Sequence, residues 1–156
     1  MCRLALSDYL CNHLGAQHRD LIYQLLFSLE AEEKQRADAA VASADLWPKV
    51  AELPKSVTVV DPACGSGSFL VGMLRILADL RLRADPFVGS NPTQYELHRE
   101  IIRNNLYGVD VMEWACHIAE LRLWLQLVIH ANLRPGELQG PRPLLPQYLE
   151  RYTPHQ

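Results

Sequence analysis

The sequence predicts an α/β protein in which a parallel sheet with flanking helices follows an α-helical segment. Two short runs, "VTVVD" at 57–61 and "LYGVD" at 106–110, have the composition of buried parallel strands. Apolar residues at helical spacing lie before, between and after these runs. The order strand, glycine turn, helix, helix, strand, helix is the one expected for an open parallel sheet with helices on its faces.

The chain begins with a predicted helical stretch at 3–44, which we expect to form two helices broken near Gly15. The second helix starts at about Asp20, and its continuation at 30–44 is rich in alanine and charge, which predicts a solvated helical extension. The two prolines of "DLWPKVAELPKS" at 45–56 predict a helix break and a linker.

After the first strand, a helix is predicted from about Ser68 to Arg83, and a loop then leads into another helix. Thr93 with Glu96 three residues later fits a capping box at the start of that helix. The segment at 113–130 is apolar nearly all round, so we expect it to be deeply packed. Its large apolar residues are Trp114, Ile118, Leu121, Trp124, Leu125 and Val128.

The composition is that of a globular protein, with 49% hydrophobic and 21% charged residues among 156. Neither a membrane span nor a secretory signal is visible, which predicts a soluble cytoplasmic protein with no membrane partner. The cysteines are too widely spaced for a zinc ribbon or a disulfide scaffold, so we expect reduced thiols and no metal. A net charge of −3 with unclustered basic residues argues against strong nucleic-acid binding by this chain alone.

The stretch "VTVVDPACGSGSFL" at 57–70 places two glycines where a strand must turn into a helix. Gly65 and Gly67 tolerate the backbone angles of such a turn and let a ligand approach the main chain. Amides at a helix start favour an anionic group, and Asp61 ends the strand beside them, which suits a ligand with both an ammonium and a carboxylate. A dinucleotide site fits poorly, because Leu70 stands where a third glycine is expected. The alternative is a tight connection with no ligand.

The string "DPACGSGSFL", followed by "REIIRNNLYGVDVMEWACHIAELRLWLQL", resembles the S-adenosylmethionine-binding half of adenine-N6 DNA methyltransferases. The similarity covers about residues 55–130 and is greatest to the large enzymes of restriction–modification systems. It implies a partial Rossmann-like class I methyltransferase fold, S-adenosyl-L-methionine as the cofactor, and DNA as the partner of the complete enzyme.

The resemblance also implies which residues bind the cofactor. Asp61 matches the acid that recognises its methionine end, and Asp110 matches the acid that accepts hydrogen bonds from the ribose hydroxyls. Phe69 matches an aromatic position beside the cofactor, although a plain core aromatic is an equal alternative. Arg122 and Trp124 lie in "LRLWL", and their helical spacing predicts packing. The full set is Asp61, Pro62, Ala63, Cys64, Gly65, Ser66, Gly67, Phe69, Asp110 and Val111.

The family's catalytic Asn/Asp-Pro-Pro-Tyr/Phe tetrapeptide does not occur in this sequence, so we expect no catalytic residue here. "NPTQY" at 91–95 is interpreted as a helix cap instead. The predicted division is a helical connector at 1–50, the cofactor-binding part at 51–135, and a Pro-rich loop or truncated connection at 136–156. Activity would then need a longer or separate chain as partner. A non-catalytic remnant or interaction module, and a methyltransferase of the same fold acting on protein or RNA, remain alternatives.

Overall fold

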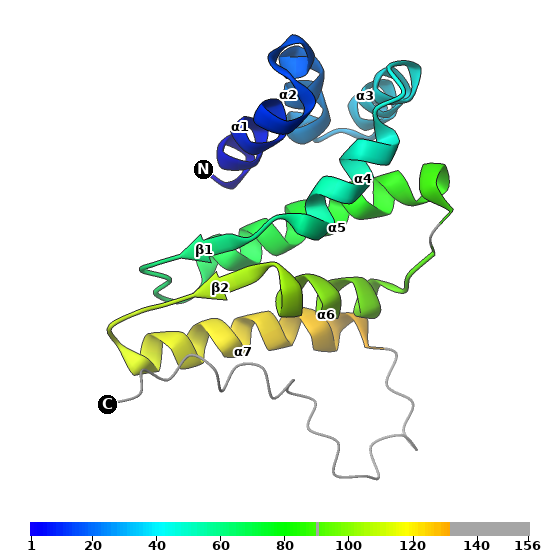
Figure 1. Ribbon diagram of the computed structural model, residues 1–156. Helices are drawn as coiled ribbons and strands as arrows, with labels where there is room; N and C mark the ends of the chain where they lie inside the picture. The colour runs from blue at the N-terminus through cyan, green and yellow to red at the C-terminus, as the bar shows by residue number, and fades with distance from the viewer. Residues whose placement is uncertain (90, 132–156) are drawn as a thin grey trace. The chain divides into compact units, whose positions relative to one another are not determined.

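The computed structural model describes residues 1–89 and 91–131, so the predicted Pro-rich loop at 136–156 lies outside them (Figure 1). The chain divides into two compact units. The helical unit comprises Met1–Val57 and Arg75–Asn91, and the sheet unit comprises Thr58–Leu74 and the chain from Pro92 onward.

The helical unit contains α1 (Cys2–Leu14), the short 3₁₀ helix η1 (Ala16–His18), α2 (Arg19–Phe27), α3 (Ala31–Ser43), α4 (Trp47–Ser56) and the later part of α5 (Ser68–Val88). The predicted break near Gly15 is confirmed, because this glycine ends α1 with a φ of 102°. The unit has an apolar core of its own, formed by Leu6, Leu10, Ile22, Leu25, Val41, Trp47, Val50, Leu77 and Leu80.

Two predictions for this unit are wrong. The stretch at 45–56 is no linker, because α4 occupies most of it. Pro48 lies in the first turn of α4, where a missing N–H costs nothing, and Pro54 lies near the end of the helix. The stretch at 30–44 is a separate helix, α3, and it buries Ala37 and Val41 rather than being solvated throughout.

Charged side chains connect α3 to α5 within the helical unit. Lys34 Nζ lies 2.7 Å from a carboxylate oxygen of Asp79. Arg83 donates to the Asp38 carboxylate at 2.6 Å and 2.8 Å and to the Leu25 carbonyl at 2.8 Å, and only 10% of its side chain is exposed. The charged residues of α3 thus bind this helix to α5, which its low apolar content did not indicate.

The sheet unit has two described strands, β1 (Val59–Asp61) and β2 (Leu106–Gly108), which pair in parallel. Val59 lies opposite Leu106 and both are buried, whereas Val60 on the other face is 57% exposed. Figure 1 shows the two arrows side by side. Both predicted strands are therefore confirmed at shorter lengths, and the unit is compatible with a partial α/β fold.

Helix α6 (Gln94–Asn104) begins with the predicted capping box. The Thr93 hydroxyl accepts the Glu96 N–H at 3.2 Å, and the Glu96 carboxylate accepts the Thr93 N–H at 3.0 Å. These reciprocal bonds satisfy two amides that would otherwise lack partners at the helix start. The interpretation of "NPTQY" as a helix cap is confirmed.

Helix α7 (Glu113–His130) follows β2 and packs beside α6. Its buried residues are Ala115, Ala119, Leu123 and Leu127. The prediction of deep packing all round is wrong, because the opposite side is solvent-exposed. We call this side the α7 stripe; it consists of Trp114, Ile118, Leu121, Leu125 and Ile129.

Candidate cofactor-binding site

The turn between β1 and α5 contains two glycines, Gly65 and Gly67, with different structural roles. Both have positive φ, 51° at Gly65 and 73° at Gly67, which disfavours any residue with a Cβ. A Cβ on Gly67 would lie 2.7 Å from the Cβ of Ala119 in α7, whereas one on Gly65 would meet nothing within 4 Å. Gly67 therefore lets the turn pack on α7, and Gly65 leaves open space beside the main chain.

Asp110 lies just beyond β2 and holds this turn by its carboxylate. One oxygen accepts the Gly65 N–H at 2.8 Å, and the other accepts the Met112 N–H at 2.9 Å. The bonds from Met112 and Gly65, with a smaller one from Val111, hold the pKa of Asp110 below its ordinary value. The carboxylate is therefore ionised at neutral pH and fixed in direction at the edge of the turn.

Asp61 lies at the end of β1, on the same edge of the sheet. Its carboxylate accepts the Ala63 N–H at 3.3 Å, and its carbonyl accepts the Val109 N–H at 2.9 Å. Cys64 N donates in turn to the Val109 carbonyl at 3.0 Å. The backbone bonds continue the pairing past the strands, so both acids stay beside the same turn, as the sequence predicted from the parallel order.

Cys64 is a buried residue of the turn, with 6% of its surface exposed. Burial is the main reason that its thiol has a pKa raised to about 11, with Cys116 and then the charges of Asp110 and Asp61 contributing further. A thiol with so high a pKa is protonated at neutral pH, so Cys64 is a structural residue of the turn and a poor nucleophile.

Arg122 is a residue of this site that the sequence interpretation missed. Its guanidinium donates to the Ser66 carbonyl at 3.0 Å, the Ser66 hydroxyl at 3.0 Å and the Ser68 hydroxyl at 2.8 Å. The expectation that Arg122 serves only packing is therefore wrong. One feature of the sequence could have indicated this role: Arg122 is the only Lys or Arg in the apolar segment at 113–130.

The other predicted residues are distributed along the turn and its flanks. Pro62, Ala63 and Ser66 are exposed, and Phe69 is half-buried in the first turn of α5. Val111 is 98% exposed. The structure thus brings Asp61, Asp110 and the glycine turn together, while contacts of Phe69 and Val111 with a cofactor stay predictions.

Neither a metal cluster nor a membrane helix appears in the part of the chain that the structure describes. No three His, Cys, Asp or Glu residues gather there as a metal site would require. Within the same ranges, every helix is too short or too polar to cross a bilayer.

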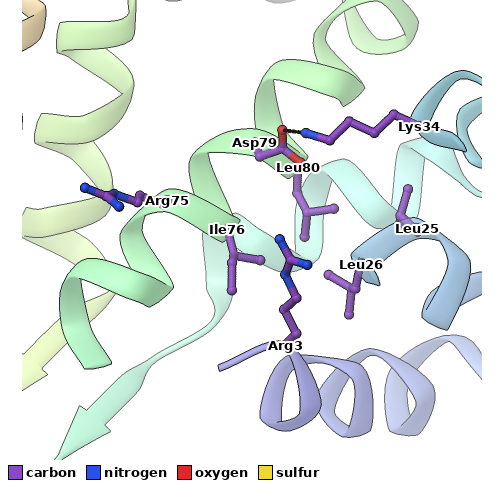
Figure 2. A pocket seen from close by; sticks show the side chains of 8 residues that line it. All are labelled: Arg3, Leu25, Leu26, Lys34, Arg75, Ile76, Asp79 and Leu80. Carbon is purple, nitrogen blue, oxygen red and sulfur yellow. Dashed lines mark hydrogen bonds and ion pairs between the residues drawn. The ribbon is translucent and has the colours of Figure 1, made fainter. Parts of the chain in front are cut away.

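A cavity of about 210 Å³ lies within the helical unit, and no residue of the glycine turn lines it (Figure 2). Figure 2 shows Lys34 bonded to Asp79 at its side and Arg3 reaching toward its aliphatic residues. It contains none of the predicted site residues and is smaller than the roughly 300 Å³ of the smallest usual ligand pockets. Its lining residues are Arg3, Leu25, Leu26, Lys34, Arg75, Ile76, Asp79 and Leu80.

Comparison with known proteins gives two matches. The model of the family described as "MmeI, DNA-methyltransferase domain" matches residues 33–146. A protein of Methanocaldococcus jannaschii, provisionally named as a type II restriction enzyme and methyltransferase, is 41% identical over 95 residues. That match covers 61% of this chain and 8% of the relative's length. No solved structure matches the chain.

The family match includes the helices α3 and α4, the glycine turn, both strands and α7. It extends over well more than half of the sequence, and the relative independently pairs methylation with restriction in its name. The chain belongs to the MmeI DNA-methyltransferase domain family and is a methyltransferase domain of the restriction–modification type.

Proposed function

We propose that the sheet unit binds S-adenosyl-L-methionine and that the complete enzyme transfers its methyl group to adenine N6 in DNA. The observation that carries this proposal is the placement of two carboxylates beside one open glycine turn. Asp61 ends one of two adjacent parallel strands and Asp110 lies just beyond the other, and Gly65 between these acids leaves the main chain accessible. Ligands of open α/β sheets bind at the carboxyl ends of such strands.

The hydrogen bonds that Asp110 accepts from the backbone leave further acceptor sites on its carboxylate for the hydroxyls of a ribose. Each carboxylate oxygen has about two acceptor sites; one oxygen accepts the Gly65 N–H and the other the Met112 N–H, with a weaker contribution from the Val111 N–H. The remaining sites suit two neighbouring hydroxyls. Because backbone donors fix the carboxylate in place, little ordering entropy would be lost when a ribose binds.

The methionine end of the cofactor carries an ammonium and a carboxylate, and the turn offers a partner for each. Asp61 supplies negative charge for the ammonium. The guanidinium of Arg122, held at Ser66 and Ser68, supplies positive charge for the carboxylate. We therefore assign Arg122 to the site together with the residues predicted from the sequence.

When bound, the cofactor supplies a methyl group on a sulfonium, whose sulfur would leave as a neutral thioether. The residues of this chain would fix the direction of that methyl group, since Asp61, Asp110 and Arg122 hold two ends of the molecule. Positioning the adenine needs acceptors for its amino group and an aromatic surface. We propose that an Asn/Asp-Pro-Pro-Tyr/Phe segment on a longer or separate chain provides them.

Calorimetric titration with S-adenosyl-L-methionine tests the site. Asp110→Asn should weaken binding about tenfold or more, because hydrogen bonds to a charged group are lost. Asp8→Asn is a matched control on an exposed face of α1 and should leave the affinity unchanged. Absence of heat with the unmutated chain would favour the remnant or interaction module, and equal affinity of both variants would place the cofactor elsewhere.

The methyl acceptor needs a separate measurement. The complete enzyme, with whatever chain supplies the tetrapeptide, should transfer labelled methyl groups to duplex DNA, and digestion should recover them as N6-methyl-2′-deoxyadenosine. Label recovered in RNA or protein instead would establish the alternative, a methyltransferase of the same fold with another substrate.

A further inference from the structure

The cavity of the helical unit contains an arginine whose hydrogen-bonding capacity is unused. Arg3 lies in the first turn of α1, and Figure 2 shows its guanidinium pointing in beside Ile76 and Leu26. In the part of the chain that the structure describes, this guanidinium makes no hydrogen bond or ion pair, and its charge lies 6.0 Å from the ring of Phe27. An aromatic ring offers no oxygen acceptor, so the five N–H donors of Arg3 are available to a ligand.

The ion pairs beside Arg3 leave one positive charge in excess. Lys34 bonds one oxygen of the Asp79 carboxylate at 2.7 Å, and Arg83 bonds the other oxygen at 3.2 Å. Arg83 is also paired with Asp38. The two acids therefore balance Lys34 and Arg83, whereas Arg3 has no counter-charge among the described residues. An excess of one positive charge favours a ligand group with a single negative charge.

The size and lining of the cavity restrict what this anion can be. A volume of about 210 Å³ is below the roughly 300 Å³ of the smallest usual ligand pockets, which suits one group of a larger molecule. The fork of a guanidinium matches the oxygens of a phosphate group. Leu25 and Leu80 are each 1% exposed and Leu26 is 4% exposed, so aliphatic surface is available to the carbon atoms next to a phosphate. A phosphodiester has both the single charge and these carbon atoms.

We propose that this cavity is a phosphate-binding site, in which Arg3 binds one backbone phosphodiester of the DNA substrate. The phosphodiester site rests on the cavity alone, whereas the choice of DNA as its source rests on the proposed function. Lys34 lines the same cavity and keeps two N–H donors beside its bond with Asp79. Phosphate contacts position a protein on DNA and do not read its sequence.

The low overall charge of the chain is compatible with this proposal. Basic residues are not clustered in the sequence, but the fold brings Arg3 and Lys34 from separate helices to one cavity. A single phosphate contact contributes only part of the affinity for DNA. We therefore expect this chain to bind DNA weakly and with a dependence on salt that decreases when Arg3 is removed.

NMR spectroscopy of the full chain tests the site with dimethyl phosphate, a phosphodiester with one negative charge. The Nε–H signal of Arg3, assigned through its side-chain carbons, should shift during the titration. The signal of Arg36 on α3, whose side chain is 77% exposed and outside the cavity, should not shift. Trimethyl phosphate has no charge and should leave both signals unchanged. An Arg3 signal that does not respond to dimethyl phosphate would overturn the proposal, and this result needs no variant that might fail to fold.

Fluorescence anisotropy with a short labelled DNA duplex at low salt tests DNA as the source of the phosphate. Arg3→Gln should weaken binding several-fold and reduce the slope of log affinity against log salt by about 0.9. Arg3→Lys should keep the slope because it keeps the charge, and Arg36→Gln is the matched control that should change little.

The two measurements separate the possible outcomes. If Arg3→Gln bound DNA with the affinity and salt slope of the unmutated chain, the DNA contact would be refuted. A response to dimethyl phosphate without any effect on DNA would instead assign the cavity to a small free phosphate. Neither measurement uses S-adenosyl-L-methionine, so a failed cofactor titration would count against the proposed function and not against this site.

Discussion

Replacing Gly67 by alanine tests how the glycine turn is held against α7. Two costs add at this position. A residue with a Cβ pays about 1–2 kcal/mol for the left-handed backbone, here at a φ of 73°. The new methyl group would also lie 2.7 Å from the Ala119 Cβ and 3.0 Å from its Cα, and overpacking of this kind costs about 1–3 kcal/mol. The total is about 2–5 kcal/mol of unfolding free energy.

Gly65→Ala is the matched control, because it shares the first cost and lacks the second. Its φ is 51°, and its Cβ would meet nothing within 4 Å, so we expect a loss of about 1–2 kcal/mol. Urea denaturation followed by circular dichroism measures both variants. If the two substitutions lowered the unfolding free energy equally, the conclusion that Gly67 is needed for packing on α7 and Gly65 is not would be refuted.

A double-mutant cycle sharpens the same test. Ala119→Gly removes the methyl group that Gly67→Ala would strike, at a helix-propensity cost of about 1 kcal/mol on its own. In this background, Gly67→Ala should cost at least about 1 kcal/mol less than in the unmutated chain. Strictly additive losses would show that the two positions are not in contact.

Three further predictions concern single side chains. Arg83→Met removes the donor from the partly buried Asp38 carboxylate and Leu25 carbonyl and should lower the unfolding free energy by about 2–3 kcal/mol. Arg36→Met, whose side chain is 77% exposed, should change the unfolding free energy by less than about 0.5 kcal/mol in the same urea titration. Burial and nearby His130 lower the pKa of His98, so the contribution of His98 to stability is complete above the ordinary pKa of about 6.5 and is lost as the pH falls from there through the lower folded pKa. His98→Gln should therefore reduce the fall in melting temperature over this acidic pH range. Arg122→Gln should weaken cofactor binding several-fold in calorimetry, with little change in melting temperature.

The sequence was most informative where the signal is local. Strand composition located β1 and β2, and the spacing of Thr93 and Glu96 located the start of α6, because a capping box uses only residues three apart. The glycine turn and its two acids follow from the same kind of local order. These features could be predicted without knowing which helices pack against each other.

The sequence failed where the outcome depends on distant residues. Pro48 and Pro54 suggested a linker, but their positions near the two ends of α4 make them compatible with a helix. Arg122 contacts a residue 56 positions away, and no spacing rule reveals such a contact. Apolar residues all round α7 do not tell which side its neighbours cover.

The α7 stripe gives the protein a built-in optical reporter. Trp114 lies on this stripe and is 59% exposed, whereas Trp47 in the core of the helical unit is 2% exposed. A water-soluble quencher such as acrylamide therefore reaches the first indole and not the second. Anything that covers the stripe would shift the emission of Trp114 toward the blue and shield it, with Trp47 as the reference inside the same molecule.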